Sequence, residues 1–195
     1  MQRQLKAYLA GPDVFLPDAV EIGRRKRALC AEHGIVGLFP LDNEVSGVGT
    51  PRDLALTISR LNEAMIDSCD IVLANLTPFR SPSLDPGTAF EIGYARAAGK
   101  TIHGYSAAAG TLLERTRAVF RLDLDTLRDR DGSSIENFGL VDNLMIDGAI
   151  DANGGFISVV PEPSLAAFKA FEDLLSRLAM RRLEDAAPRQ RATKA

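Results

Sequence analysis

The sequence of 195 residues is poor in the side chains that most metal sites and many hydrolytic centres use, since it has two histidines, two cysteines and no tryptophan. Cys30 and Cys69 lack CxxC spacing, which argues against a zinc site or a disulfide framework, and both are expected to be small core residues. His33 and His103 are far apart, with no serine elbow or HExxH motif. Any catalysis is therefore expected to rest on carboxylates.

Long apolar runs and an excess of basic residues are also absent. No stretch approaches the roughly 18 apolar residues of a membrane-spanning helix, and Lys6 follows Arg3 too closely for a signal peptide. The formal net charge of -3 argues against a nucleic-acid binder, which usually carries a basic excess. We therefore expect a soluble, cytoplasmic protein with a small-molecule ligand and with neither a membrane nor a nucleic-acid partner.

The glycine-rich motifs that hold phosphates are missing. Neither a P-loop nor a Gly-x-Gly-x-x-Gly fingerprint occurs, so nucleotide-phosphate and dinucleotide cradles are unsupported. The segment Asp129-Arg130-Asp131-Gly132 has a faint similarity to a calcium loop, but Leu127 and Phe138 stand where the first and last acidic ligands belong. No metal site is predicted.

Apolar segments and turn signals alternate in an order typical of an α/β protein. Strands are expected at Lys6–Ala10, Ile35–Phe39, Asp70–Leu76, Lys100–Tyr105 and Gly154–Val160, and helices at Pro17–His33, Pro51–Ser68, between Asp85 and Gly99, and at Ser164–Leu183. This order predicts a doubly wound sheet of about five mainly parallel strands, with helices on both faces and a ligand site at the carboxyl ends of the strands. Residues 1–183 are expected to form a single domain and residues 184–195 a disordered tail.

The segment between the fourth and fifth strands has a less regular pattern. Leu113–Arg130 is charge-rich and is expected to form an amphipathic helix that runs into a loop. Ser133-Ser134-Ile135-Glu136 has capping-box spacing and predicts a further helix. Its apolar stripe is expected to contain Ile135, Phe138, Val141, Leu144 and Met145, with Asn143 on the polar side beside Glu136 and Asp147.

The stretch Asp85–Ala95 places a carboxylate inside a small and apolar helix. Asp85 suits the N-cap position, Pro86 the first helical position and Gly99 the C-terminal stop. Few polar residues stand near Glu91 on this helix, which favours a role for its carboxylate as a nucleophile or as an acid/base group. The alternative is a solvated glutamate or a structural ion pair. Several residues around Glu91 on this helix are small and allow a backbone or a ligand to come close: Gly87, Ala89, Gly93, Ala95, Ala97 and Ala98.

Four segments, spread over roughly residues 5 to 147, occur in an order typical of one enzyme family. They are Tyr8-Leu9-Ala10-Gly11-Pro12, Cys69-Asp70-Ile71-Val72-Leu73-Ala74-Asn75-Leu76, Asp85-x-Gly87-Thr88-Ala89-Phe90-Glu91-Ile92-Gly93-Tyr94-Ala95 and Asn143-Leu144-Met145. Together they resemble the nucleoside 2-deoxyribosyltransferase family. The resemblance implies a flavodoxin-like fold, transfer of 2-deoxyribose between nucleobases, and no cofactor.

The resemblance also implies roles for individual residues. Glu91 is the nucleophile, and Tyr8 is the hydroxyl that orients it. Asp85 binds the sugar, and Asn143 is a sugar contact donated by a neighbouring subunit of a homo-oligomer. A hydrogen bond from Tyr8 is expected to lower the pKa of Glu91 and keep it ionised. The alternatives are a packing role for Tyr8, a purely capping role for Asp85 and a surface or interface amide for Asn143.

Further residues are expected to line the substrate site. Gly11, Gly87 and Met145 belong to the segments that carry the resemblance. Phe15, Phe39 and Phe79 are candidates to stack on the base, with a core position as the alternative for each. The polar segment Asp42-Asn43-Glu44 after the second strand is a further candidate to face the base.

One departure from the family pattern concerns the leaving base. Many relatives carry an aspartate eight residues before the position of Asp70, whereas this chain has Asn62. An amide can form a hydrogen bond to a base but cannot act as a general acid. Asp67, Asp42 or water remain as sources of the proton.

The sequence thus predicts a deoxyribosyltransferase that acts on deoxynucleosides and free nucleobases by double displacement through Glu91. The nearest alternative is an N-glycosidase of deoxynucleosides or their 5'-monophosphates. Asp85 would repel a phosphate, whereas Arg80 and the hydroxyls of Ser81, Ser83 and Thr88 keep this alternative open. A non-catalytic nucleoside-binding module is the remaining possibility.

Overall fold

Five parallel strands form the central sheet of the chain, which we describe from a computed structural model. The structure describes residues 3–43, 45, 47, 49–120, 122–123 and 125–186. The strands are β1 (Leu5–Ala10), β2 (Ile35–Leu38), β3 (Ile71–Asn75), β4 (Thr101–Ser106) and β7 (Ile157–Val159), in the spatial order β2-β1-β3-β4-β7. Every neighbouring pair is parallel, and the register places Ala7 opposite Ile71.

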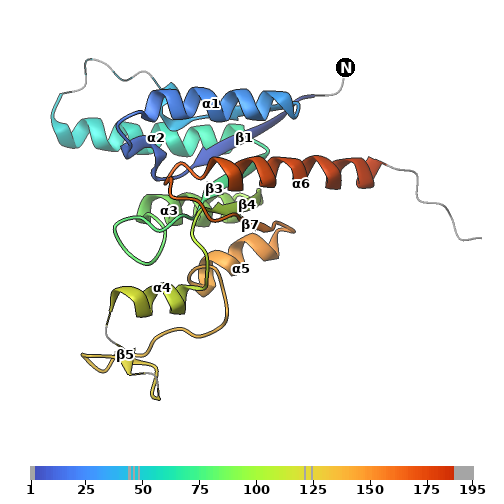
Figure 1. Cartoon of the computed structure of the whole chain (residues 1–195). Coiled ribbons are helices and arrows are strands. Elements are labelled where there is room, and N and C mark those ends of the chain that lie inside the picture. Colours follow the sequence, from blue (N-terminus) through green and yellow to red (C-terminus); the bar gives the residue numbers. More distant parts are fainter. Residues whose placement is uncertain are drawn as a thin grey trace, which may run out of the picture.

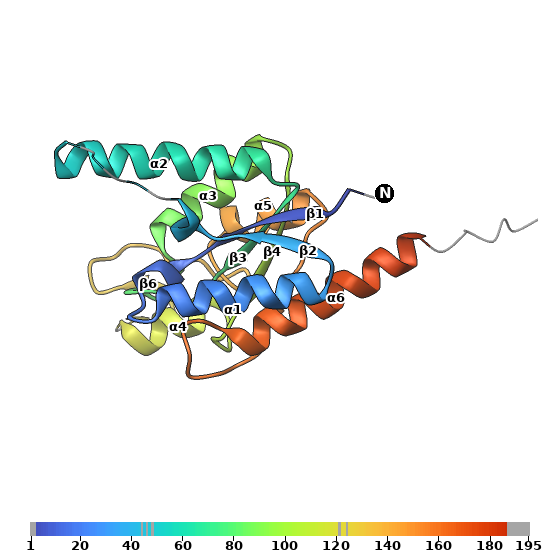
Figure 2. The ribbon, with the colours of Figure 1, turned by 90° about the horizontal axis from the view of Figure 1, so that it is seen from above.

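Helices cover both faces of this sheet. They are α1 (Ala19–Glu32), α2 (Pro51–Ser68), α3 (Pro86–Ala97), α4 (Leu112–Val119), α5 (Leu144–Ala152) and α6 (Phe168–Ala186). Side chains of α1 and α6, such as Cys30 and Phe171, are buried in one core cluster. Ile66 of α2, Ile92 of α3 and Ile150 of α5 are buried in a second cluster on the other face. Figure 2 shows the resulting three layers, with α2, α3 and α5 on one side of the strands and α1 and α6 on the other.

The order of the strands reverses at β1, because β2 lies on one side of β1 and β3 on the other. Ligands of open α/β sheets bind at the carboxyl ends of the strands beside such a switch point. Here β1 is followed by Gly11 and the short 3-10 helix η1 (Pro12–Phe15), and β3 ends at Asn75. The predicted flavodoxin-like α/β fold is confirmed.

The segment between β4 and α5 departs from the prediction. The helix expected over Leu113–Arg130 ends at Val119 as α4, and β5 (Leu122–Asp123) and β6 (Arg128–Asp129) then form a small antiparallel hairpin. Figure 1 shows α4 and this hairpin projecting from the sheet, at the opposite end of the view from α1 and α2.

The helix predicted to begin at the capping box of residues 133–136 is wrong. Gly139 interrupts this segment with a φ of 70°, and α5 begins only at Leu144. The side chain of Glu136 instead accepts a hydrogen bond from the backbone N–H of Leu144, so it caps α5 from outside the helix. The polar face expected to carry Asn143 and Glu136 therefore does not exist as a helix face.

The remaining boundaries lie close to those predicted. α2 has the predicted limits, because Thr50 and Asp53 form a capping box at its start. The closing helix α6 continues to Ala186, past its predicted end at Leu183, while residues 187–195 of the predicted tail lie outside the described part of the chain. Cys30 and Cys69 are both buried, as predicted. Among the described helices, none combines the length and apolar character needed to cross a membrane.

Candidate active site

The pair formed by Tyr8 and Glu91 is the centre of the candidate site. Tyr8 lies on β1 and its side chain is fully buried. Glu91 lies on α3, and the phenol of Tyr8 donates a hydrogen bond of 2.5 Å to its Oε1. Residues 83 positions apart are thus brought together because α3 packs against the sheet next to β1. The predicted contact between the tyrosine hydroxyl and the glutamate is present.

Burial and the hydrogen bond have opposite effects on Glu91. Burial is the larger influence and raises the pKa of Glu91 to about 7, the hydrogen bond from Tyr8 lowers it, and the nearby charge of Asp85 raises it. The hydrogen bond from Tyr8 lowers the pKa of Glu91, as predicted, but desolvation outweighs it, so the net shift is upward. Burial and the charge of Glu91 raise the pKa of Tyr8, so the phenol remains a hydrogen-bond donor.

Asp85 stands at the N-cap of α3, directly before Pro86. Its Oδ2 accepts a hydrogen bond of 3.1 Å from the backbone N–H of Thr88, so the predicted capping role is observed. A Cβ atom at Gly87 would lie 2.8 Å from the same Oδ2, which explains why a glycine suits this position. Asp85 and Glu91 are close enough for the charge of one to affect the other, as the pKa of Glu91 shows.

A buried polar network, which the sequence analysis did not identify, holds the loop after β1. Lys26 is fully buried, and its Nζ donates to Asp13 Oδ1 at 2.9 Å and to the hydroxyl of Tyr105 at 2.8 Å. Asn75 Nδ2 lies 3.4 Å from both carboxylate oxygens of Asp13 and donates to the carbonyl of Leu165 at 2.8 Å. The sequence signal was available, since Lys26 lies between Ile22 and Cys30 on the apolar face of α1.

Gly11 allows this loop to approach the end of β3. A Cβ atom at Gly11 would stand 2.7 Å from the Cβ of Asn75 and 2.7 Å from Oδ2 of Asp13. The contact is internal to the fold, so the structure gives Gly11 a packing role. A role in substrate binding stays a prediction.

Two of the three candidate stacking residues lie together. The rings of Phe15 and Phe79 stack with centroids 5.4 Å apart, and the guanidinium of Arg80 lies over both. Phe15 is 56% exposed, whereas Phe79 is 8% exposed. The third candidate, Phe39, is buried in the core beneath α1, which favours the alternative of a core position.

The polar residues after β2 are engaged mainly within the chain. Asp42 pairs with Arg27 and accepts a hydrogen bond of 2.9 Å from the backbone N–H of Phe39. Asn43 Nδ2 lies 3.4 Å from Asn62 Oδ1, so these two amides are neighbours. Glu44 lies outside the described residues. Asp42 thus has partners within the chain, and a role toward the base stays a prediction.

Asn143 and Met145 lie at the start of α5. Asn143 is the N-cap, because its Oδ1 accepts a hydrogen bond of 3.0 Å from Met145 N–H, while its Nδ2 donates to Glu136 at 2.6 Å. Met145 is 71% exposed. It also lines an open groove of about 580 Å³ between α3 and α5. Apart from Arg96, the other lining residues are glycine, alanine, leucine or isoleucine: Ala89, Ile92, Gly93, Ala97, Leu144, Ile146, Gly148 and Ala149.

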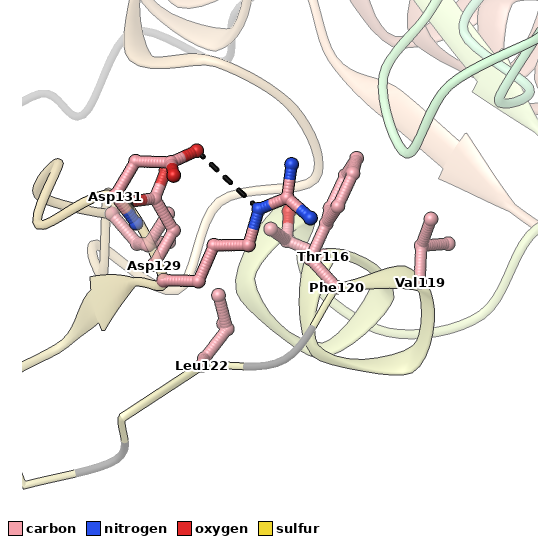
Figure 3. A pocket seen from close by; sticks show the side chains of 8 residues that line it. Thr116, Val119, Phe120, Leu122, Asp129 and Asp131 are labelled. Atoms are coloured by element: carbon pink, nitrogen blue, oxygen red, sulfur yellow. Dashed lines mark hydrogen bonds and ion pairs between the residues drawn. The ribbon is translucent and has the colours of Figure 1, made fainter.

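A separate pocket lies outside this site. It has a volume of about 510 Å³ and is formed by α4 and the β5–β6 hairpin (Figure 3). Its lining contains none of the predicted site residues: Thr116, Val119, Phe120, Leu122, Asp129, Arg130, Asp131 and Ile135. In the described part of the chain, no group of three or more histidine, cysteine, aspartate or glutamate side chains is arranged to hold a metal ion.

The fold and the central pair define a class of protein. It is a flavodoxin-like α/β protein with a tyrosine-bound glutamate beside the switch point of the sheet. Comparison of the sequence with known protein families identifies the family to which the chain belongs. The model of the nucleoside 2-deoxyribosyltransferase family matches residues 7–145, and the chain belongs to this family.

Individual relatives agree with this assignment. The chain is 31% identical over 187 residues to an uncharacterised protein of Schizosaccharomyces pombe, over 88% of this chain and 89% of that protein. It is also similar to the solved structure of a 2-deoxyribosyltransferase from Leishmania mexicana, with 37% identity and a TM-score of 0.61. That match covers 87% of this chain and 97% of the Leishmania chain.

Proposed function

We propose that the protein transfers 2-deoxyribose from a 2'-deoxynucleoside to an acceptor nucleobase through a covalent intermediate on Glu91. The observation that carries this proposal is the 2.5 Å hydrogen bond from buried Tyr8 to Glu91, within a chain of the deoxyribosyltransferase family. A partly buried carboxylate held in one orientation by a neighbouring hydroxyl suits nucleophilic attack on an anomeric carbon.

The reaction proceeds in two displacements. A carboxylate oxygen of Glu91 forms a bond to C1' of the sugar while the bond from C1' to the base nitrogen breaks, and the base leaves with the electron pair. The nitrogen of a second base then attacks C1' from the vacated side and releases the carboxylate. The two inversions give net retention. The charge of ionised Glu91 stabilises the positive charge that builds on the sugar in each transition state.

Asp85 and Tyr8 have supporting roles in this proposal. Tyr8 fixes the side chain of Glu91 and favours its ionised form. Asp85 accepts a hydrogen bond from the 5'-hydroxyl of the sugar through the carboxylate capacity that the Thr88 N–H leaves unused. A 5'-phosphate is a poorer ligand at this position because its charge has the same sign as that of Asp85.

The base is bound by aromatic and amide groups. We propose that the exposed ring of Phe15 stacks on the base, while buried Phe79 stacks against this ring and the guanidinium of Arg80 lies over both rings. The neighbouring amides of Asn62 and Asn43 form hydrogen bonds to the base edge. An amide does not supply a proton, so the proton for the leaving base comes from water in this proposal.

The hydrolytic alternative for 5'-monophosphates has weaker support. Ser83 donates its hydroxyl to Asp142, and Ser81 donates its hydroxyl to the carbonyl of Ser83. Arg80 lies over the rings of Phe15 and Phe79. Three of the groups that would bind a phosphate are thus engaged in contacts within the chain, whereas the buried hydroxyl of Thr88 has no hydrogen-bond partner among the described residues.

Chromatography of the purified protein with a deoxynucleoside donor and a different free base tests the proposal. A new deoxynucleoside is expected with the wild type and none with Glu91→Ala. Free base and deoxyribose without exchange would establish hydrolysis instead, and the assay would then be repeated with the 5'-monophosphate. The absence of turnover with several donors, together with retained nucleoside binding, would favour a non-catalytic module.

A further inference from the structure

Asp142 is a buried carboxylate that none of the roles above uses. It lies directly before Asn143, the N-cap of α5, and is 1% exposed. Its oxygens accept hydrogen bonds from the hydroxyl of Ser83, from Leu84 N–H at 3.1 Å and from Asn143 N–H at 2.8 Å, and Arg115 lies at 3.5 Å. The carboxylate therefore joins the loop before α3 to the start of α5.

The position of Asp142 is itself fixed from two directions. Asp147, in the first turn of α5, accepts hydrogen bonds from Val141 N–H at 3.1 Å and Asp142 N–H at 2.8 Å. Arg115 of α4 donates to the carbonyls of Pro82 and Gly110 at 2.9 Å each, and also to Val141. Three segments that are distant in the sequence meet at this point, so a displacement of Asp142 is resisted from each side.

The contact with Leu84 N–H connects this junction to the proposed site. Leu84 is the residue before Asp85, and Asp85 caps α3 through Thr88 N–H one turn before Glu91. We infer that Asp142 is a positioning residue that holds residues 82–84 so that the carboxylate of Asp85 is aimed at the 5'-hydroxyl of the sugar. This inference rests on the proposed function.

An acceptor side chain is required at this position because all of its partners are donors. Replacement of Asp142 by asparagine keeps the shape but turns an NH2 group toward at least one N–H or O–H donor. Depending on the orientation of the amide, its NH2 group faces either the Leu84 N–H or the Ser83 hydroxyl and the Asn143 N–H. Both orientations weaken the hold on residues 82–84, while the rest of the junction retains Asp147 and the carbonyl contacts of Arg115. The loss of these hydrogen bonds is thus expected to change mainly the position of the Asp85 carboxylate.

Kinetics with two donors test the inference. For Asp142→Asn we expect kcat/KM for a 2'-deoxynucleoside to fall about 10- to 100-fold, as for a lost hydrogen bond to a charged group. With a 2',5'-dideoxynucleoside, which lacks the 5'-hydroxyl, kcat/KM of Asp142→Asn should be only a few-fold below that of the wild type. Asp85→Asn should likewise lose much less kcat/KM with this donor than with the 2'-deoxynucleoside. The double variant should be no worse than Asp85→Asn alone. Asp151→Asn, at an exposed position of α5, is the matched control and should have no effect.

An equal penalty on both donors, or additive effects of the two variants, would overturn the inference. If Asp142→Asn does not fold, Ser83→Ala can be used instead, because it removes one hydrogen-bond donor from the junction. Its kcat/KM should fall by a smaller factor, and again more for the 2'-deoxynucleoside than for the 2',5'-dideoxynucleoside. Ser83→Ala with full activity on both donors would also contradict it.

Amide hydrogen exchange separates this inference from the proposed function, because it needs no turnover. If Asp142 positions Asp85, Asp142→Asn should speed exchange at Thr88 N–H, whose partner is the Asp85 carboxylate, with the later turns of α3 unchanged. Unchanged protection at Thr88 would overturn the positioning role. A wild type without any turnover would instead refute the proposed function, and the exchange at Thr88 would still decide whether Asp142 holds Asp85.

Discussion

At the scale of single residues, the ionisation of Glu91 decides whether the proposed nucleophile is available. Burial raises the pKa of this carboxyl to about 7, and Tyr8 opposes that shift. The reactive form is the carboxylate, whose fraction rises with pH. The kcat/KM of the wild type should therefore increase with pH through a midpoint near 7.

Tyr8→Phe tests the contribution of the hydroxyl. The ring still fills its site on β1, but Glu91 loses the hydrogen bond that favours its charged form. The midpoint of the rising limb of kcat/KM should move about one to two pH units upward, so that the loss of activity is large at pH 7 and smaller at pH 9. A pH profile of both proteins checks this. A midpoint that stays in place or moves downward would contradict the role given to Tyr8.

Asp85→Asn should shift the same midpoint in the opposite direction. Removal of its negative charge removes an influence that raises the pKa of Glu91, so the rising limb moves to lower pH. At the same time the KM for the deoxynucleoside should rise about tenfold, since the proposed acceptor for the 5'-hydroxyl is weakened. Steady-state kinetics across pH measure both effects. A purely capping role would leave KM unchanged.

At the scale of elements, the buried Asp13–Lys26 pair fixes the loop between β1 and α1. Lys26→Met leaves the Asp13 carboxylate buried without its cation, which should lower the free energy of unfolding by about 3–5 kcal/mol. Asp13→Leu combined with Lys26→Met removes both charges and should recover most of this loss. Chemical denaturation of the three proteins checks the prediction. A double variant as unstable as Lys26→Met would contradict it.

The sequence predicted those elements whose signals are local. Thr50, Pro51 and Asp53 define the start of α2, and Asp85 and Pro86 define the start of α3, because capping depends on residues a few positions apart. The contact between Tyr8 and Glu91 was reached only through the resemblance to the family, since two residues 83 positions apart carry no local signal for their contact.

Features that depend on distant partners were missed. The capping-box pattern at residues 133–136 satisfied the local rule, yet Glu136 binds the start of α5. Lys26 was not singled out among the charged residues of α1, because its burial depends on Asp13, Tyr105 and the aromatic residues of α6. The upward net shift in the pKa of Glu91 was missed for the same reason, since desolvation arises from the packed fold.

At the scale of the whole molecule, the α3–α5 side exposes apolar surface. Phe90 and Met145 are 57% and 71% exposed and Leu144 is 40% exposed. We propose that a second copy of the chain covers this side and that Asn143 of one subunit completes the site of its neighbour. Both ends of the Asn143 amide bind within its own chain in this structure, so Glu136 would have to release Nδ2 for that role.

Mixing of two inactive variants tests the shared site. If Asn143 acts in the neighbouring subunit, Glu91→Ala and Asn143→Ala form mixed assemblies in which one site has both residues intact, and activity should reappear on mixing. Sedimentation of each variant alone shows whether the assembly persists. Assembled mixtures without recovered activity would show that Asn143 acts within its own chain or not at all.

The central claim is the covalent intermediate on Glu91, and mass spectrometry after rapid quenching tests it most directly. The protein is incubated with a 2'-deoxynucleoside in the absence of an acceptor base, denatured, digested and searched for a deoxyribosyl adduct. We predict one deoxyribosyl group on the peptide that contains Glu91, absent from Glu91→Gln and lost when a free base is added before quenching. Transfer with no adduct on that peptide, or an adduct that survives in Glu91→Gln, would contradict the account.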